Sequence, residues 1–407
     1  MASRALIPLL VAMMLLTGVC NTLLTKYQDM QCVANCDSED PSKRLYFNQP
    51  VLQTAQMFVG EMGCWLVVGL MALYRRYGPG ASREGYETVN TNDTDDANTA
   101  LVNPNRRHKP QEEGYGAILR GHRILLLALP AICDILGTTL MNIGLLLVVA
   151  SIYQMTRGAL VLFVGLFSVI FLRRHLYLFQ WLSLMGVVLG VAVVGLAGAI
   201  YHEDKNTESA ADDGAPASNA LMSVVGVLLI AGAQIFTATQ FVLEEWILER
   251  SAIEPIKVVG WEGLFGFTVT VIGMIVLHLA IGRTDAGRNG FFDMVEGWRQ
   301  LTENRAIGIS SILIMISIGG FNFFGLSVTR SVSATSRSTI DTCRTLFIWI
   351  VSLGLRWETF KWLQVVGFAL LVYFTFLFNG IVQPPFKFLV PEEEIEELLP
   401  EEPIEHQ

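Results

Sequence analysis

The chain is poor in charge and in histidine, and it lacks the short motifs that mark common enzyme sites. Charged residues make up 16% of its 407 positions, against about a quarter in an average soluble protein. No His-Glu-x-x-His, Gly-x-Ser-x-Gly or phosphate-binding loop occurs, and cysteines and histidines form no cluster. These absences predict a protein that is not an enzyme and holds neither metal nor cofactor. The lack of a basic stripe also argues against nucleic-acid binding.

The acidic charge that is present is concentrated at one end of the chain. The formal net charge is -9, and the tail Pro384–Gln407 contributes seven of these charges through eight glutamates and one lysine. The rest of the chain is apolar, and hydrophobic residues make up 52% of the whole sequence. Long apolar runs alternate with short polar patches, a pattern typical of proteins that cross a membrane several times.

Windows of about 20 apolar residues, the length of a helix that spans a bilayer, recur ten times. We therefore expect an all-α integral membrane protein with ten transmembrane helices. The first segment is interpreted as a retained helix rather than a cleaved signal peptide, because its apolar character continues through Leu24. No polar turn separates the third and fourth segments, so only the length of a span places their boundary near 146–150. The segments are 6–25, 51–74, 124–145, 151–172, 178–200, 221–247, 257–281, 306–328, 334–355 and 359–381.

An even number of spans places both chain ends on one side of the membrane. Lysine and arginine number 15 on that side and ten on the other, which favours cytosolic ends. The predicted domains are a first five-helix repeat (1–200, with a cytosolic loop at 76–121), a luminal linker (201–218), a second repeat (219–383) and an acidic cytosolic tail (384–407). Repeats with an odd number of helices must insert in opposite orientations, so we expect an inverted pair.

Two arginines, Arg157 and Arg344, lie within apolar runs in similar surroundings. Each follows a polar residue by three positions, Gln154 and Asp341 respectively, and each precedes a Trp-Leu-x-x-x-Gly stretch. An arginine in hydrocarbon costs at least ~2.5–3.5 kcal/mol, so it is normally paired or functional. We predict that both arginines and Gln154 bind an anionic group of a solute, with Asp341 orienting Arg344. The alternative is that each arginine is a structural pin bonded within its own helix.

Other polar residues follow the same order in both halves. We predict that Asp134 and Glu61 couple transport to protons and that Glu262 orients the arginines. The amide side chains of Asn21, Gln240 and Asn322 are predicted to bind substrate. The alternative role for these acids and amides is helix packing through interhelical hydrogen bonds. Glu244 and Glu245 lie near the end of the sixth segment, where we expect solvated positions. The series consists of Asn21, Glu61 and Asp134 in the first half and Gln240, Glu262 and Asn322 in the second.

Two features stand out in the predicted luminal loops. Cys32 and Cys36 share the loop after the first segment, so a local disulfide between them is expected in an oxidising compartment. Apolar residues between Phe291 and Leu301 recur at helical spacing with charged residues between them. This pattern predicts a short amphipathic helix that lies on the membrane surface.

The acidic tail contains a sequence that is typical of a sorting signal. Glu394, Leu398 and Leu399 form an acidic dileucine pattern, which clathrin-adaptor-type sorting machinery reads on cytosolic tails. This pattern predicts a lysosomal or endosomal membrane protein, with the Golgi and the mitochondrion as alternatives. The alternative for the tail itself is a merely solvated acidic segment.

Six short stretches, spread over roughly 6–380, carry a family resemblance. They are Met57–Glu61, Leu129–Asp134, Gly165–Val169, Val242–Glu245, Glu262–Phe267 and Phe321–Phe323. They resemble solute carrier family 35, subfamily F, in the branch that includes the adenine-nucleotide-translocase-2-binding protein, within the drug/metabolite transporter superfamily. The resemblance implies a carrier fold that is often described as similar to nucleotide-sugar transporters. It also implies a mitochondrial carrier protein as a candidate partner.

These observations together predict a secondary active transporter that moves a small polar organic solute by alternating access, with coupling to protons. The predicted partners are the solute, the lipid bilayer and the sorting machinery, and a homodimer is left open. Two alternatives remain at this stage. One is a nucleotide-sugar transporter, and the other is a membrane adaptor that binds other proteins without transporting a solute.

Overall fold

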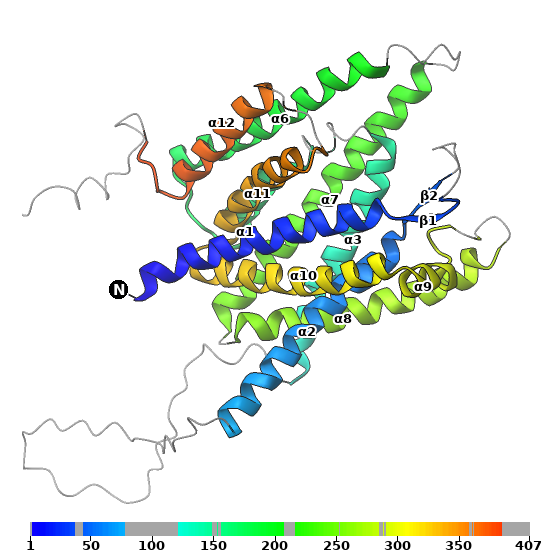
Figure 1. Cartoon of the computed structure of the whole chain (residues 1–407). Helices are drawn as coiled ribbons and strands as arrows, with labels where there is room; N and C mark the ends of the chain where they lie inside the picture. Colours follow the sequence, from blue (N-terminus) through cyan, green and yellow to red (C-terminus); the bar gives the residue numbers. More distant parts are fainter. Residues whose placement is uncertain are drawn as a thin grey trace, which may run out of the picture.

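The computed structural model describes residues 2–36, 44–77, 121–148, 153, 156–206, 216–251, 253–284, 288, 290–357, 360 and 362–384. In this part the chain is almost wholly helical (Figure 1). Two short strands, β1 (Cys32–Ala34) and β2 (Leu45–Tyr46), pair antiparallel. The helices are α1 (Ala2–Asp29), α2 (Pro50–Tyr77), α3 (Ala128–Leu147), α5 (Leu160–Phe171), α6 (Leu178–Asn206), α7 (Pro216–Arg250), α8 (Pro255–Leu277), α9 (Met294–Glu303), α10 (Arg305–Ser331), α11 (Ala334–Gly354) and α12 (Trp362–Phe378).

Each predicted apolar segment contains one of these helices, and the all-helical membrane class is confirmed. Among the described residues, six helices are long and apolar enough to cross a membrane: α1, α2, α3, α7, α8 and α10. The apolar stretches in α5, α6 and α12 are shorter, at 10–17 residues. α11 differs because it carries Arg337, Asp341 and Arg344 within a run of serines and threonines. Its polar face needs protein partners rather than lipid.

In the fourth predicted segment the helix is interrupted: Tyr153, Thr156 and Arg157 are helical, and a turn follows at Gly158 and Ala159. The helix α5 then begins at Leu160. Gly158 packs so closely on α6 that a β-carbon on it would lie 2.6 Å from Val191. Arg157 therefore lies directly before the turn that precedes α5.

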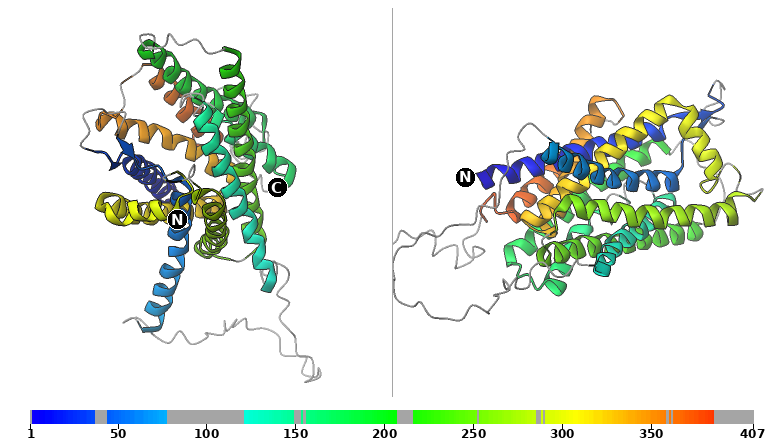
Figure 2. Two further views of the ribbon diagram at one scale, coloured as in Figure 1. Left: turned by 90° about the vertical axis from the view of Figure 1, so that its right-hand side faces the viewer. Right: turned by 90° about the horizontal axis from the view of Figure 1, so that it is seen from below.

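The helices pack in pairs. α3 lies along α7, α1 along α10, α2 along α8, and α6 along α12. Views at right angles show α3 and α7 side by side and α6 and α12 together at one edge of the bundle (Figures 1 and 2). The start of α1 and the end of α12 lie on the same side of the molecule (Figure 1).

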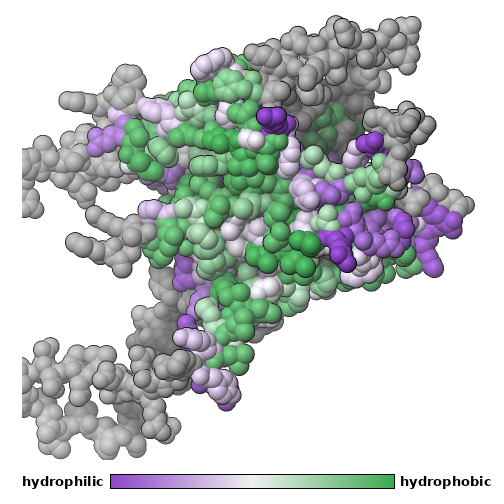
Figure 3. Space-filling view, in the orientation of Figure 1, coloured by the Kyte–Doolittle hydropathy of each residue, from purple (hydrophilic) through white to green (hydrophobic). Residues whose placement is uncertain are grey.

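The outer surface of the bundle suits a lipid environment. Large apolar side chains are exposed along the helices, among them Leu66, Leu228 and Ile316, each at least 65% accessible. Hydrophobic surface covers the middle of the visible face, and hydrophilic residues gather at its ends, notably around α9 (Figure 3). This distribution is typical of a protein whose helices cross a bilayer.

The loops on the side opposite the start of α1 are ordered by local bonds. A disulfide joins Cys32 to Cys36, with Cα atoms 5.8 Å apart, next to the β1–β2 pair. The amphipathic pattern forms the helix α9, as predicted, and the Asp293 side chain caps its first turn by accepting a hydrogen bond from the Glu296 amide. Val295 and Trp298 remain exposed on α9.

Candidate functional site

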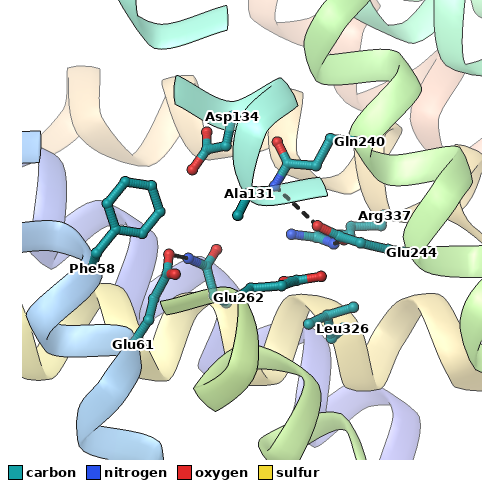
Figure 4. A pocket seen from close by; sticks show the side chains of 10 residues that line it. Phe58, Glu61, Ala131, Asp134, Gln240, Glu244, Glu262, Leu326 and Arg337 are labelled. Carbon is teal, nitrogen blue, oxygen red and sulfur yellow. Dashed lines mark hydrogen bonds and ion pairs between the residues drawn. The ribbon is translucent and has the colours of Figure 1, made fainter. Parts of the chain in front are cut away.

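A small polar cavity lies in the middle of the bundle, where α2, α3, α7, α8, α10 and α11 meet (Figure 4). The space open to the centre of a water molecule is about 10 Å³, which is room for about one water. Acids, amides and one arginine dominate its walls. The lining residues are Phe58, Glu61, Ala131, Asp134, Gln240, Glu244, Glu262, Asn322, Leu326 and Arg337.

The strongest interaction in the cavity is a buried ion pair between α7 and α11. Arg337 Nη1 lies 2.5 Å from Glu244 Oε2, and the two side chains are only 2% and 1% exposed. Gln240 donates to the other Glu244 oxygen at 2.9 Å (Figure 4), and the Arg337 guanidinium lies 4.1 Å from the Phe241 ring. Such a pair holds its helices together only while both charges are present, because either charge alone would be buried without compensation.

Glu61 is positioned by an unusually close approach of α2 to α10. A β-carbon on Gly319 would lie 2.6 Å from the Gly60 carbonyl oxygen, so only glycine allows the two backbones to meet here. The contact brings Glu61 beside Asn322, whose amide donates to Glu61 Oε1 at 2.6 Å. The interhelical hydrogen bond fixes the carboxyl group at the cavity wall.

The two remaining acids lack a basic partner among the described contacts. Asp134 accepts one long hydrogen bond, 3.4 Å, from Thr138 on its own helix. Glu262 is 7% exposed, and its Oε1 atom is buried without a hydrogen-bond partner in the described part of the chain. Both carboxyl groups thus remain available to a proton, a cation or a polar solute.

The charges in the cavity do not balance. Four carboxyl groups share the space with the single guanidinium of Arg337. If all were ionised, three negative charges would be left uncompensated in a water-poor interior, at a large cost in free energy. Groups in this situation take up protons or attract cations, so not all four carboxyl groups are expected to be ionised together.

The predicted arginine pair lies outside this cavity. Arg344 is 8% exposed, donates to Asp341 Oδ2 at 3.3 Å and lies 4.8 Å over the Phe321 ring. Arg157 and Arg337 both lie within electrostatic range of Arg344. The buried atoms Asn21 Oδ1, Asp341 Oδ1 and Arg344 Nε have no hydrogen-bond partner among the described residues.

The sequence-predicted residues thus divide into two groups, with Arg337 within electrostatic range of both. The basic group contains Arg344, its partner Asp341, and Arg157; Asn21 lies on α1 and does not line the cavity. Gln154 lies outside the described residues, as do Glu394, Leu398 and Leu399 of the tail. The acidic group is formed by Glu61, Asp134, Gln240, Glu262 and Asn322, all of which line the cavity.

The expectation that Glu244 is solvated is corrected by this arrangement. Glu244 is 1% exposed rather than solvated, because α7 continues to Arg250 and carries this residue inside the bundle. Glu262 lines the cavity with Arg337, and none of the described hydrogen bonds or ion pairs joins it to Arg157 or Arg344, so its role in orienting them stays a prediction. Arg337 itself was not assigned to the site, although the spacing of Arg337, Asp341 and Arg344 places all three on one helical face and was the available signal.

The bundle is closed on the side where α7 ends and α11 begins. Glu245, predicted to be solvated, is 2% exposed, and its Oε2 atom accepts a 3.1 Å hydrogen bond from the Ala334 amide at the start of α11. Arg174, between α5 and α6, pairs with Glu245 at 3.0 Å and also with Glu249. A carboxylate at a helix N-terminus is stabilised by the helix dipole, so the contact joins three elements firmly.

Comparison with known proteins identifies relatives over nearly the whole chain. A family model described as nucleotide-sugar transporter matches residues 115–324. Solute carrier family 35 member F6 of Homo sapiens is 35% identical over 92% of this chain and 89% of its own length, and the Mus musculus protein is 33% identical over 93% and 90%. A Schizosaccharomyces pombe protein named as uncharacterized is 38% identical over 93% of this chain and 98% of its own length.

A helical bundle with an apolar exterior, an internal polar cavity and these relatives is a multi-pass membrane transporter. The chain belongs to the nucleotide-sugar transporter family, among the members of solute carrier family 35. The family resemblance carried by the six short stretches is thereby confirmed.

Proposed function

We propose that the chain crosses the membrane ten times as two inverted five-helix repeats. The support comes from the packing pairs, if α1, α2, α3, α5 and α6 are matched in order with α7, α8, α10, α11 and α12. Under this matching, each contact between a helix of one half and a helix of the other should have an equivalent contact. The contact of α3 with α7 is equivalent to that of α10 with α1, α5 with α7 to α11 with α1, and α3 with α8 to α10 with α2. All six contacts occur. The pairs α2–α8, α5–α11 and α6–α12 map onto themselves, as contacts across a pseudo-two-fold axis do. The helix α9 has no counterpart in this scheme.

On this frame the protein is a secondary active transporter that moves a small polar organic solute by alternating access. The observation that carries the proposal is the uncompensated acid cavity, which is built from helices of both halves. Solute and ion sites in inverted-repeat transporters lie near the bilayer midplane between the repeats, which is where such a cavity would be found. A purely adhesive protein would have no need to bury three excess carboxyl groups.

The two polar groups have different roles in this proposal. Asp134 and Glu61 bind and release protons, because Asp134 has only a weak partner on its own helix and Glu61 is held by a neutral amide. Arg157 and Arg344 bind an anionic group of the solute, and Asn21 adds an acceptor whose Oδ1 atom is unpartnered in the described structure. Arg337 links the two groups electrostatically, so a change of charge in one is felt in the other.

The conformation is an occluded one. The cavity holds only about one water, and the contacts of Glu245 with Arg174 and Ala334 close the side that carries the start of α1. Transport requires these contacts to separate so that the two halves can open the cavity to that side. The ion pair at Arg174 is half exposed, with 46% of the arginine side chain accessible, so its rupture has a modest cost.

Asp134→Asn is expected to uncouple transport from the pH gradient. The amide keeps the size and the Thr138 contact but carries no exchangeable carboxyl proton, so uptake by reconstituted vesicles should no longer rise with an imposed gradient. The measurement is initial uptake with and without a gradient, and Asp293→Asn, in the loop before α9, serves as the matched control. A gradient response unchanged in Asp134→Asn would remove this residue from the coupling step.

We place the protein in the lysosomal or endosomal membrane on the basis of the tail signal. Replacing Leu398 and Leu399 by alanine is expected to shift most of the protein to the cell surface, because the sorting machinery reads both leucines. The measurement is quantitative surface labelling of cells that express each form, with Pro400→Ala as control. Unchanged lysosomal staining would contradict the assignment and favour the Golgi or the mitochondrion.

Nucleotide-sugar transport is the second candidate function, and the family match over residues 115–324 favours it. The diphosphate of such a substrate would suit Arg157 and Arg344, because planar guanidinium groups bind phosphate oxygens in pairs. Uptake assays with nucleotide sugars therefore belong beside those with amino acids and other small polar solutes.

A further inference from the structure

A second, much larger cleft lies outside the bundle core, between the β1–β2 pair and α9. Its volume is about 710 Å³, which falls in the usual range for small-molecule sites. β1, β2 and α9 lie together at the end of the molecule away from the start of α1 (Figure 1). The cleft is lined by Asp29, Val33, Ala34, Arg44, Leu45, Tyr46, Phe47, Asn48, Gln49, Phe291, Glu296, Arg299 and Gln300, none of which lines the acid cavity.

The formal charges of the cleft cancel. The lining contains two acids, Asp29 and Glu296, and two bases, Arg44 and Arg299. The pair on α9 is bidentate: Arg299 Nη2 and Nε donate to the two Glu296 oxygens at 2.6 and 2.9 Å. The hydrogen bonds from Arg299 hold the pKa of Glu296 below its usual value, so this pair stays ionised and neutralised from within. A cleft of this kind favours an uncharged ligand over an anion or a cation.

Two amide oxygens in the cleft lack partners among the described residues. Gln300 donates its amide to Glu296 Oε1 at 2.9 Å, which orients the group and leaves its own Oε1 atom unpartnered. Gln49 is 2% exposed, and its Oε1 atom is also unpartnered. Buried acceptors without donors are costly, so a ligand that brings hydrogen-bond donors to them is favoured. The ligand should therefore carry hydroxyl or amide N–H groups.

The remaining wall is aromatic and apolar. Tyr46 and Phe291 are 49% and 39% exposed, and the buried Phe47 lies between the strand and α2. Aromatic faces bind the apolar side of a ligand, while planar amides and carboxylates bind its polar edge. We propose that this cleft is a binding site for a neutral sugar, whose C–H face lies against the aromatic rings and whose hydroxyl groups donate to Gln49 and Gln300.

The test is saturation-transfer NMR on the full chain in nanodiscs, with glucose and N-acetylglucosamine as neutral probes and glucuronate and choline as charged ones. The neutral sugars are expected to bind and the charged probes to bind at least tenfold more weakly. Gln300→Leu and Tyr46→Ala should each weaken sugar binding at least tenfold. Tyr46 is half exposed, so its replacement keeps the test decisive where Gln300→Leu fails to fold.

Two controls separate the cleft from the transport site. Trp298→Ala, on α9 but outside the cleft lining and 61% exposed, should leave sugar binding unchanged. Arg344→Ala, in the bundle, should also leave it unchanged even where transport is lost. The proposal is overturned if neither neutral sugar binds, if the charged probes bind equally well, or if both cleft variants retain full binding. Loss of binding only in Arg344→Ala would place the sugar in the transport site instead.

Discussion

Replacement of Arg337 by methionine is expected to destabilise the protein by about 3–5 kcal/mol, the usual cost of removing one partner of a buried ion pair. Methionine fills a similar volume but leaves Glu244 without its cation at 1% exposure. The cavity would then hold four carboxyl groups and no basic residue. The measurement is the unfolding midpoint of the purified protein in detergent, followed by denaturant titration.

The double variant Arg337→Met with Glu244→Gln is the control for this prediction. It removes both charges, and Gln240 can still bond the new amide, so most of the lost stability should return. If the single variant were as stable as the unchanged protein, Glu244 would already be neutral, and the pair would not hold α7 to α11. If the double variant were as unstable as Arg337→Met alone, the lost stability would come from the packing of Arg337 against Phe241 instead.

Replacement of Arg344 by alanine is expected to lower uptake strongly in protein that still folds. The arginine bonds to Asp341 on its own helix and lies on the face of Phe321, so its loss breaks no hydrogen bond between helices in the described structure. The change leaves the Asp341 carboxylate without its cation at 13% exposure, so the free energy of unfolding should fall as well. A charged hydrogen bond to a solute contributes roughly 1.5–3 kcal/mol, so uptake should fall about 10- to 100-fold. The measurement is initial uptake by vesicles that contain equal amounts of folded protein.

Two further variants serve as controls for Arg344→Ala. Arg344→Lys keeps the charge but loses the planar fork, and partial uptake is expected from it. Arg305→Ala, at the exposed start of α10, should transport normally. A loss of folded protein in Arg344→Ala, rather than of uptake alone, would show that the residue is a structural pin.

The fold could be predicted from the sequence where apolar length decides it. Segments such as 51–74 and 306–328 are apolar over the full thickness of a bilayer, and only a helix satisfies all the backbone hydrogen bonds of such a segment in lipid. The turn at Gly158 and Ala159 before α5 could not be predicted from the local pattern, because Gly158 packs against Val191 of α6, a contact between separate helices. The local sequence of a helix does not predict which other helix it contacts.

The candidate site, like the fold, could be predicted where the local sequence decides it and not where contacts between helices do. Glu61, Asp134, Gln240, Glu262 and Asn322 could be found because a polar residue within an apolar run needs a polar neighbour, and the matching order suggested a common place. The pairing of Glu244 with Arg337 was missed because each lies near the end of its apolar run, where solvent is the expected partner. Only the crossing of α7 and α11 shows that both are buried.

The most direct test of transport uses purified protein in liposomes and a complex mixture of small metabolites. The vesicles are incubated with a cell extract under an imposed pH gradient, washed, and analysed by mass spectrometry. We predict that one class of small polar solutes accumulates in vesicles with the unchanged protein and not in those with Arg344→Ala, and that Asp134→Asn loses the dependence on the gradient. Equal contents in vesicles with and without the protein, for every detectable metabolite, would contradict the transporter account.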